Sequence, residues 1–311
     1  MEDNSELNPP PPSGCVAEPM TGIIQHKVAQ RAQVDATHLP DILMIFLITA
    51  SMAIITTRWL QLPAFGIDWL GVYRPAVSEI LSWRSPYNIQ GFYNPPWTLL
   101  PLIPFAVFPA KTGMILVMVA SLAAFYYVAR KIGAHPITAA VLIFSPAVVF
   151  DLMPMNVNSL VVLGLVLPPQ VGLFFVLIKP QVGAVIALFW LVEAWRDGGF
   201  KQMARIFTPA TLALIASFLI YGFWPLNSLT VPPNPNVNIS VWPEAIPIGL
   251  VLLVYAIRKR DERFALYSAP MFYPYIMYTA WAIPLLGLIK YRLEFYVAVM
   301  GLWLAYFLRI Q

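Results

Sequence analysis

The residues best suited to chemistry lie in a short stretch after the first long apolar run. Asp68 and Tyr73 are followed by Ser85-Pro-Tyr87 and by Tyr93-Asn-Pro-Pro96. A carboxylate can accept a proton during catalysis, and aromatic rings can stack on sugars. Aromatic residues are also common at any membrane interface, whereas an unneeded charge beside the hydrocarbon is costly. Asp68 is therefore the first residue to explain.

Composition sets the class of protein. Hydrophobic residues make up 59% of the 311 residues and charged residues only 11%, with a mean hydropathy of +0.71. These values exclude a water-soluble domain and predict an integral membrane protein. The strand alternation of a closed barrel does not occur, so the sequence predicts an all-α bundle. The single cysteine, Cys15, predicts no disulfide framework, and we expect no nucleic-acid partner.

The chain divides into a polar leader and one membrane domain. Residues 1–38 carry Pro9-Pro-Pro-Pro12 and predict a disordered cytoplasmic leader rather than a signal peptide, and residues 39–311 form the transmembrane domain. Because a crossing takes roughly 20 residues, the apolar runs predict roughly 9–11 membrane segments, some of them too short to cross alone. We place these segments at residues 41–60, 112–129, 137–152, 158–167, 170–179, 182–195, 203–224, 244–257, 264–274, 277–289 and 293–308.

The basic residues predict the orientation of the bundle. With a cytoplasmic N-terminus, most Lys and Arg residues lie on the inner side, Arg258, Lys259, Lys201 and Arg205 among them. The remaining cations include a cluster in or beside the first outer loop, namely Arg58, Arg74, Arg84 and Lys111. We therefore expect a multi-pass protein of the bacterial plasma membrane with its chemistry on the outer face.

The first outer loop, residues 61–111, is long and only partly polar. Apolar residues recur at helical spacing opposite polar ones, which predicts a helix on the membrane surface; they are Leu70, Tyr73, Val77, Ile80 and Leu81. Residues 97–109 contain three prolines and are too short to cross, so they predict a re-entrant piece. Together these segments would roof a cavity in the outer leaflet.

The order of these landmarks resembles glycosyltransferase family 87. Asp68, Tyr73, Ser85-Pro-Tyr87 and Tyr93-Asn-Pro-Pro96 are followed by Asn156-Val-Asn158 and by Lys179-Pro-Gln181. The resemblance covers residues 41–205. That family comprises integral membrane enzymes of the GT-C type, which include mannosyltransferases that use polyprenyl-phosphate mannose. The resemblance implies a GT-C bundle that transfers a sugar, with inversion, from a lipid-linked donor without a cofactor.

The resemblance also implies roles for individual residues. Asp68 matches the aspartate that acts as general base on the acceptor hydroxyl, a role typically worth about 10²–10⁴ in rate. Lys179 is the candidate partner of the departing phosphate, with Arg74 and Arg84 in second rank. The remaining candidates would line the substrate pocket: Tyr73, Tyr87, Tyr93, Asn156, Asn158, Gln181 and, as a second acid on the outer side, Asp151.

Each candidate also has a plainer explanation. Asp68 could cap the surface helix that begins at Trp69, and Asn158 could cap the helix that follows it. Lys179 could extend its ammonium group to the membrane surface, and Asn156 could serve a turn. Asp151 could hold a metal, orient the acceptor or sit among headgroups. Because hard cations recruit several oxygen ligands, we predict no obligatory metal.

The short hairpin between Asn158 and Lys179 keeps a second class of function open. Its two arms, split by Pro168-Pro169, would each reach only about 15 Å of a roughly 30 Å core. This truncation favours a non-catalytic GT-C-derived subunit that binds lipid or a partner membrane protein. A transporter is the third hypothesis, but the chain has few intramembrane charges and no matched pair of broken helices.

Overall fold

The computed structural model describes residues 65–229 and 238–309, and every regular element within these two ranges is helical. The all-α prediction is thus confirmed for the described part of the chain. Outside the described residues lie the predicted leader at 1–38, the first predicted span at 41–60 and residues 230–237. All the described residues belong to one compact unit.

Residues 65–106, the described part of the predicted first outer loop, fold into short helical pieces. These are η1 (Trp69–Tyr73), α3 (Arg74–Leu81), η2 (Pro86–Asn88), η3 (Pro96–Leu102) and α4 (Ile103–Ala106). Tyr73 and Val77 on the predicted apolar face are buried, whereas Leu70 and Leu81 at its ends are exposed. The proline-rich piece forms η3 and α4, which pack against each other and leave α4 beside α5.

The next elements are α5 (Ala110–Ile132), α6 (Pro136–Ile143) and α7 (Pro146–Leu152). The structure contains α5 where residues 112–129 predicted a span. The predicted span at 137–152 is divided into two helices, because the helix breaks before Pro146. Ser145 has an extended backbone with ψ of 152°, as expected for a residue before proline, and proline cannot donate a helical hydrogen bond.

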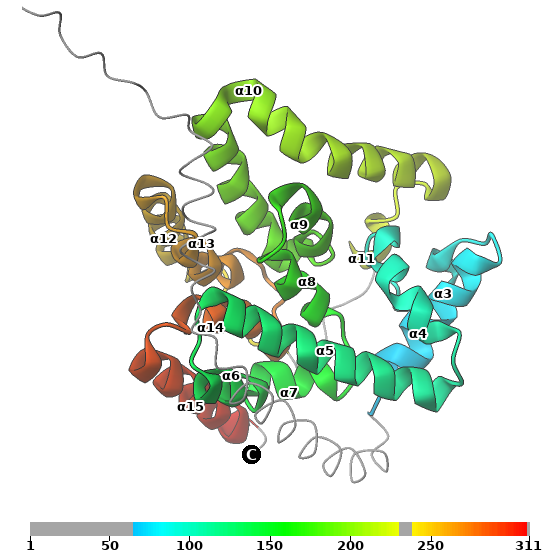
Figure 1. Ribbon diagram of the computed structural model, residues 1–311, viewed down its shortest axis with the longest axis horizontal. Coiled ribbons are helices and arrows are strands. Elements are labelled where there is room, and N and C mark those ends of the chain that lie inside the picture. Colours follow the sequence, from blue (N-terminus) through cyan, green and yellow to red (C-terminus); the bar gives the residue numbers. More distant parts are fainter. Residues whose placement is uncertain (1–64, 230–237, 310–311) are drawn as a thin grey trace, which may run out of the picture. The chain divides into compact units, whose positions relative to one another are not determined.

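The hairpin consists of α8 (Asn158–Gly164) and α9 (Pro169–Val176), and it leads into α10 (Pro180–Tyr221). The hairpin packs on α5 and on α10 (Figure 1). The predicted spans 182–195 and 203–224 are the two halves of α10, which bends visibly in Figure 1. The bend falls at Gly198 and Gly199, and Gly199 adopts φ of 60° and ψ of −151°, a conformation essentially confined to glycine.

The rest of the described chain forms a series of shorter helices and a longer C-terminal one. They are α11 (Leu226–Leu229), α12 (Ile246–Lys259), α13 (Glu262–Ser268), η4 (Ala269–Phe272), η5 (Tyr278–Trp281), α14 (Ala282–Leu288) and α15 (Arg292–Arg309). The predicted segments at 264–274 and 277–289 are each divided into a 3₁₀ turn and an α-helix. Helices α12 and α13 pack against each other, and both contact α10 (Figure 1).

Two of the described helices, α5 and α10, are long and apolar enough to cross a membrane on their own. The hairpin helices α8 and α9 have 7 and 8 residues. At 1.5 Å per residue each is about 10–12 Å long, well short of a roughly 30 Å hydrocarbon core. The predicted shortness of this hairpin is therefore confirmed.

Candidate functional site

Asp68 is fixed to the turn that follows α7. Gly66, at a φ of 70°, donates its backbone N–H to the Met153 carbonyl at 2.8 Å, and the Asp68 N–H donates to the Pro154 carbonyl at 2.9 Å. These bonds hold the first outer loop against residues that lie far along the chain. The Asp68 side chain then meets Asn156, whose Nδ2 donates to Asp68 Oδ2 at 2.8 Å.

The capping explanation of Asp68 is wrong. Asp68 does occupy the position before η1, but its backbone is already helical and its side chain accepts no capping hydrogen bond. Its carboxylate is therefore free for the contact with Asn156. Asn156 also serves its local turn, because its Oδ1 accepts the Val157 N–H at 2.7 Å.

A second carboxylate lies deeper, at the end of α7. Asp151 is fully buried, and its Oδ1 accepts Asn158 Nδ2 at 2.7 Å. Asn158 is the first residue of α8 and makes no capping bond, so the capping explanation is wrong for it too. The other oxygens of this pair, Asp151 Oδ2 and Asn158 Oδ1, are buried without a hydrogen-bond partner among the described residues. Such orphaned acceptors are costly unless a donor reaches them.

Lys179 brings a positive charge to both acids from the residue just before α10. Its side chain is only 5% exposed, so the explanation that it merely reaches for the membrane surface is wrong. Its charge acts on Asp68 and on Asp151. A buried ammonium group without compensating charge would be strongly unfavourable, so its attraction to each carboxylate stabilises Lys179, whereas the two carboxylates repel each other.

Opposing effects act on the pKa of the Asp68 carboxyl group. Burial raises the pKa of its carboxyl group above the ordinary value, while the Lys179 charge and the Asn156 hydrogen bond act in the opposite direction. A carboxylate with a raised pKa is a stronger base, once ionised, than a solvated one.

Two tyrosines and Asn94 form a hydrogen-bonded group next to Lys179. The Tyr73 hydroxyl donates to Asn94 Oδ1 at 3.5 Å, and Asn94 Nδ2 donates to the Ile178 carbonyl at 2.9 Å, next to Lys179. The Tyr87 hydroxyl donates to the Asn94 carbonyl at 3.0 Å. The Tyr87 ring stacks on Trp224 beyond α10, with centroids 5.5 Å apart and planes 7° apart.

Sequence reasoning missed Asn94 and Trp224 as members of this group. Asn94 stood inside the Tyr93-Asn-Pro-Pro96 motif, and its position directly after Tyr93 was the available signal. Trp224 carried no such signal, because its stacking on Tyr87 depends on the course of α10.

Four predicted residues lie outside the hydrogen-bond network. Arg74 is half-buried, and its Nε has no hydrogen-bond partner within residues 65–229 and 238–309. Arg84 is exposed and pairs with Glu79 at 2.7 Å, so the structure does not bring it to Asp68. Tyr93 and Gln181 are half-buried. Among the described residues, no three His, Cys, Asp or Glu side chains gather in a group that could hold a metal ion.

Comparisons with models of known protein families, with characterised proteins and with solved structures give no match for this chain. The site must therefore be interpreted from its own geometry. What it offers is a half-buried carboxylate oriented by an amide, a buried ammonium group and a second acid, all beside tyrosine rings.

Proposed function

We propose that this chain is a membrane glycosyltransferase of the GT-C type, similar to glycosyltransferase family 87. It transfers a sugar, with mannose as the first candidate, from a polyprenyl phosphate to an acceptor on the outer face, with inversion. The observation that carries this proposal is the placement of Asp68 beside Asn156 and within the field of Lys179. These residues come from three segments that the family resemblance named separately.

In this mechanism Asp68 accepts the proton of the acceptor hydroxyl as that oxygen attacks the anomeric carbon. The bond from that carbon to the phosphate oxygen breaks, and the polyprenyl phosphate leaves with the bonding electron pair. Lys179 stabilises the negative charge that grows on the phosphate. Asn156 orients the carboxylate, and Tyr73 and Tyr87 supply rings and hydroxyl groups that suit a sugar.

Residence in the membrane is part of the same proposal, as a multi-pass protein of the bacterial plasma membrane with a cytoplasmic N-terminus. Two features support it. Helices α5 and α10 have the length and apolarity of membrane spans. Large apolar side chains also face outward along α10, α12 and α15, for example Leu219 at 82%, Val251 at 69% and Met300 at 70% exposed. A water-soluble monomer rarely exposes so much continuous apolar surface.

The decisive experiment measures sugar transfer by the purified chain in lipid from a panel of labelled polyprenyl-phosphate sugars. We expect one donor to be consumed and Asp68→Asn to lower turnover by about 10²–10⁴ while the protein stays folded. Glu79→Gln is the matched control, because it neutralises an acid of the same loop that pairs with Arg84 away from the site. Full turnover by Asp68→Asn, or retention of the anomeric configuration, would rule out Asp68 as the base.

The short hairpin favours one alternative, a non-catalytic subunit that binds lipid or a partner membrane protein. Helices α8 and α9 together leave much of a bilayer thickness unfilled by this part of the chain. A partner subunit would occupy that space. In this case a folded preparation consumes no donor, and the chain isolated from its native membrane contains a second protein in fixed ratio.

A further inference from the structure

The C-terminal end of α12 carries a small basic cavity. Tyr255, Arg258 and Lys259 line it, and its volume is about 280 Å³. Lys259 Nζ lies 5.9 Å from the centre of the Tyr255 ring, which holds the ammonium group beside the aromatic face. The cavity therefore presents two cationic groups and a phenol around one space.

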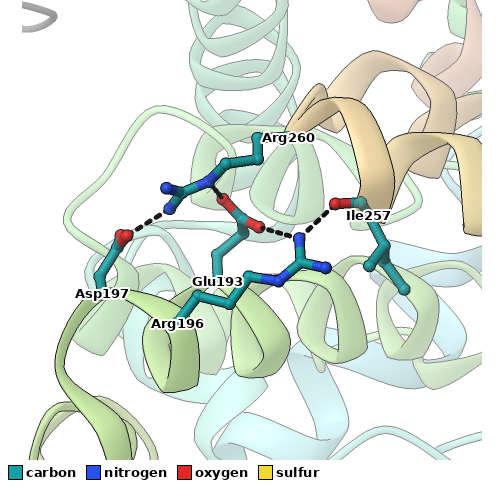
Figure 2. A network of polar contacts seen from close by, with 5 residues as sticks. All are labelled: Glu193, Arg196, Asp197, Ile257 and Arg260. Carbon is teal, nitrogen blue, oxygen red and sulfur yellow. Dashed lines mark hydrogen bonds and ion pairs between the residues drawn. The ribbon is translucent and has the colours of Figure 1, made fainter.

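The neighbouring acids already have other partners, and one of them, Glu262, accepts the Trp190 indole N–H at 2.8 Å. Arg260 pairs with Glu193 at 2.6 Å and with Asp197, and Glu193 also pairs with Arg196, as Figure 2 shows. Figure 2 also shows Arg196 donating to the Ile257 carbonyl, which fixes this network to α12. Arg263 is likewise held by Asp261.

Arg258 and Lys259 differ from these paired arginines. Both are exposed, and neither forms an ion pair within the described ranges 65–229 and 238–309. Because the nearby carboxylates already have partners, the cavity keeps an unbalanced positive charge. Its natural complement is an anion that enters from outside the protein.

An apolar stripe leads along α12 to the same cavity. Ile248, Val251 and Val254 are 58%, 69% and 53% exposed, and at 3.6 residues per turn they share one face with Tyr255, Arg258 and Lys259. The opposite face of α12 packs on α13 and η4. The outward face thus combines a hydrocarbon-like strip about two turns long with a cationic end.

We infer that this face binds one anionic phospholipid, with its phosphate in the cavity between Arg258 and Lys259 and its acyl chains along Ile248, Val251 and Val254. A soluble anion would need only the cavity, whereas a phospholipid would use both the cavity and the apolar stripe. Basic pockets on the cytoplasmic side of membrane helices suit such headgroups. The site goes beyond the proposed sugar transfer, but it rests on the proposed residence of the chain in a membrane.

The test uses the purified full chain in neutral detergent micelles and two lipids labelled on the acyl chain, phosphatidylglycerol and phosphatidylcholine. Fluorescence anisotropy measures the binding of each lipid. We expect phosphatidylglycerol to bind about tenfold more tightly or better, and the double variant Arg258→Gln/Lys259→Gln to bring the two affinities within about twofold of each other. Both replaced residues are exposed, so the fold should persist, as circular dichroism would verify.

The matched control is Lys201→Gln/Arg205→Gln, which removes the same charge from two exposed residues of α10. It should keep the preference for phosphatidylglycerol. Equal binding of the two lipids by the unmodified chain, or an equal loss of preference in the control, would overturn the inference. Displacement of labelled phosphatidylglycerol by millimolar glycerol 1-phosphate would also overturn it, because the cavity would then bind a soluble phosphate.

Discussion

The value of Asp68 as a base depends on its ionisation, and its environment makes that ionisation sensitive to pH. Burial raises the pKa of Asp68. Below that pKa the carboxyl group is protonated and cannot accept a proton. Transfer should therefore rise with pH along a limb that lies above the ordinary aspartate range, and kcat/KM measured against pH reports its position.

Asn156 should control where that limb falls. Its hydrogen bond to Asp68 lowers the pKa of the carboxyl group, so Asn156→Ala should move the limb to higher pH as well as reduce the maximal rate. Asn88→Ala is the matched control, because Asn88 donates to Glu79 on the exposed side of the loop. A limb unchanged in Asn156→Ala would show that another group sets the pH dependence.

Lys179 should act chiefly on the leaving phosphate. Lys179→Met preserves most of the side-chain volume but removes the charge, and we expect turnover to fall by about 10² or more. Lys111→Met, which changes an exposed lysine at the start of α5, should leave turnover intact. Steady-state kinetics with purified donor distinguishes the two, and equal turnover by both variants would exclude Lys179 from the chemistry.

The charged and amide residues of the site could be predicted from the sequence, but the contacts between them could not. Asp68, Asn156, Asn158 and Lys179 were recognisable because polar groups are rare in so apolar a chain. Their pairing was not, because capping and turn roles explain the same residue types equally well. Asn94 was overlooked for a physical reason: its partner, the Ile178 carbonyl, is 84 residues away and has no side-chain signal.

The backbones of α9 and α10 approach each other very closely where the hairpin of α8 and α9 meets α10. A Cβ atom on Gly183 would lie 1.8 Å from the Val176 carbonyl oxygen at the end of α9. Gly183→Ala should force the two helices apart and lower the free energy of unfolding by about 1–3 kcal/mol, as judged by thermal or denaturant unfolding.

Gly71→Ala is the control for that substitution. A Cβ atom on Gly71 would meet nothing within 4 Å, so the variant should unfold at nearly the same point as the parent chain. Because Gly183 lies four residues after Lys179, Gly183→Ala should also reduce sugar transfer. Unchanged stability in Gly183→Ala would mean that α9 and α10 are less closely packed than the structure has them.

Helix positions were predictable where prolines and apolar runs agreed. Proline lies at the first or second position of α6, α7, α9, α10 and α12, where its missing N–H costs nothing. The break at Pro146 was missed because hydropathy is continuous across it. The division of α10 into two predicted spans agrees with its bend at Gly198 and Gly199, because the polar residues Arg196 and Asp197 mark the interruption between its two helical halves.

For the whole molecule, the orientation proposal makes a labelling prediction. In a background with Cys15→Ser, a cysteine at Trp83, which is 98% exposed in the first outer loop, should react with a membrane-impermeant maleimide in intact cells. A cysteine at the exposed Lys201 should react only after the cells are permeabilised. Reaction of both in intact cells, or the reverse order, would contradict the proposed orientation.

The long separation between the partners of the site also affects its biosynthesis. Asp68 and Asn156 are 88 residues apart, and Asn94 and Ile178 are 84 apart. A ribosome adds about 5–20 residues per second, so Asp68 waits roughly 4–18 s for its amide partner to be made. During that interval the nascent first outer loop lacks the surface on which it will pack. The site can assemble only when translation has passed the start of α10, so a chain released earlier would carry all the loop's sequence motifs and none of its contacts.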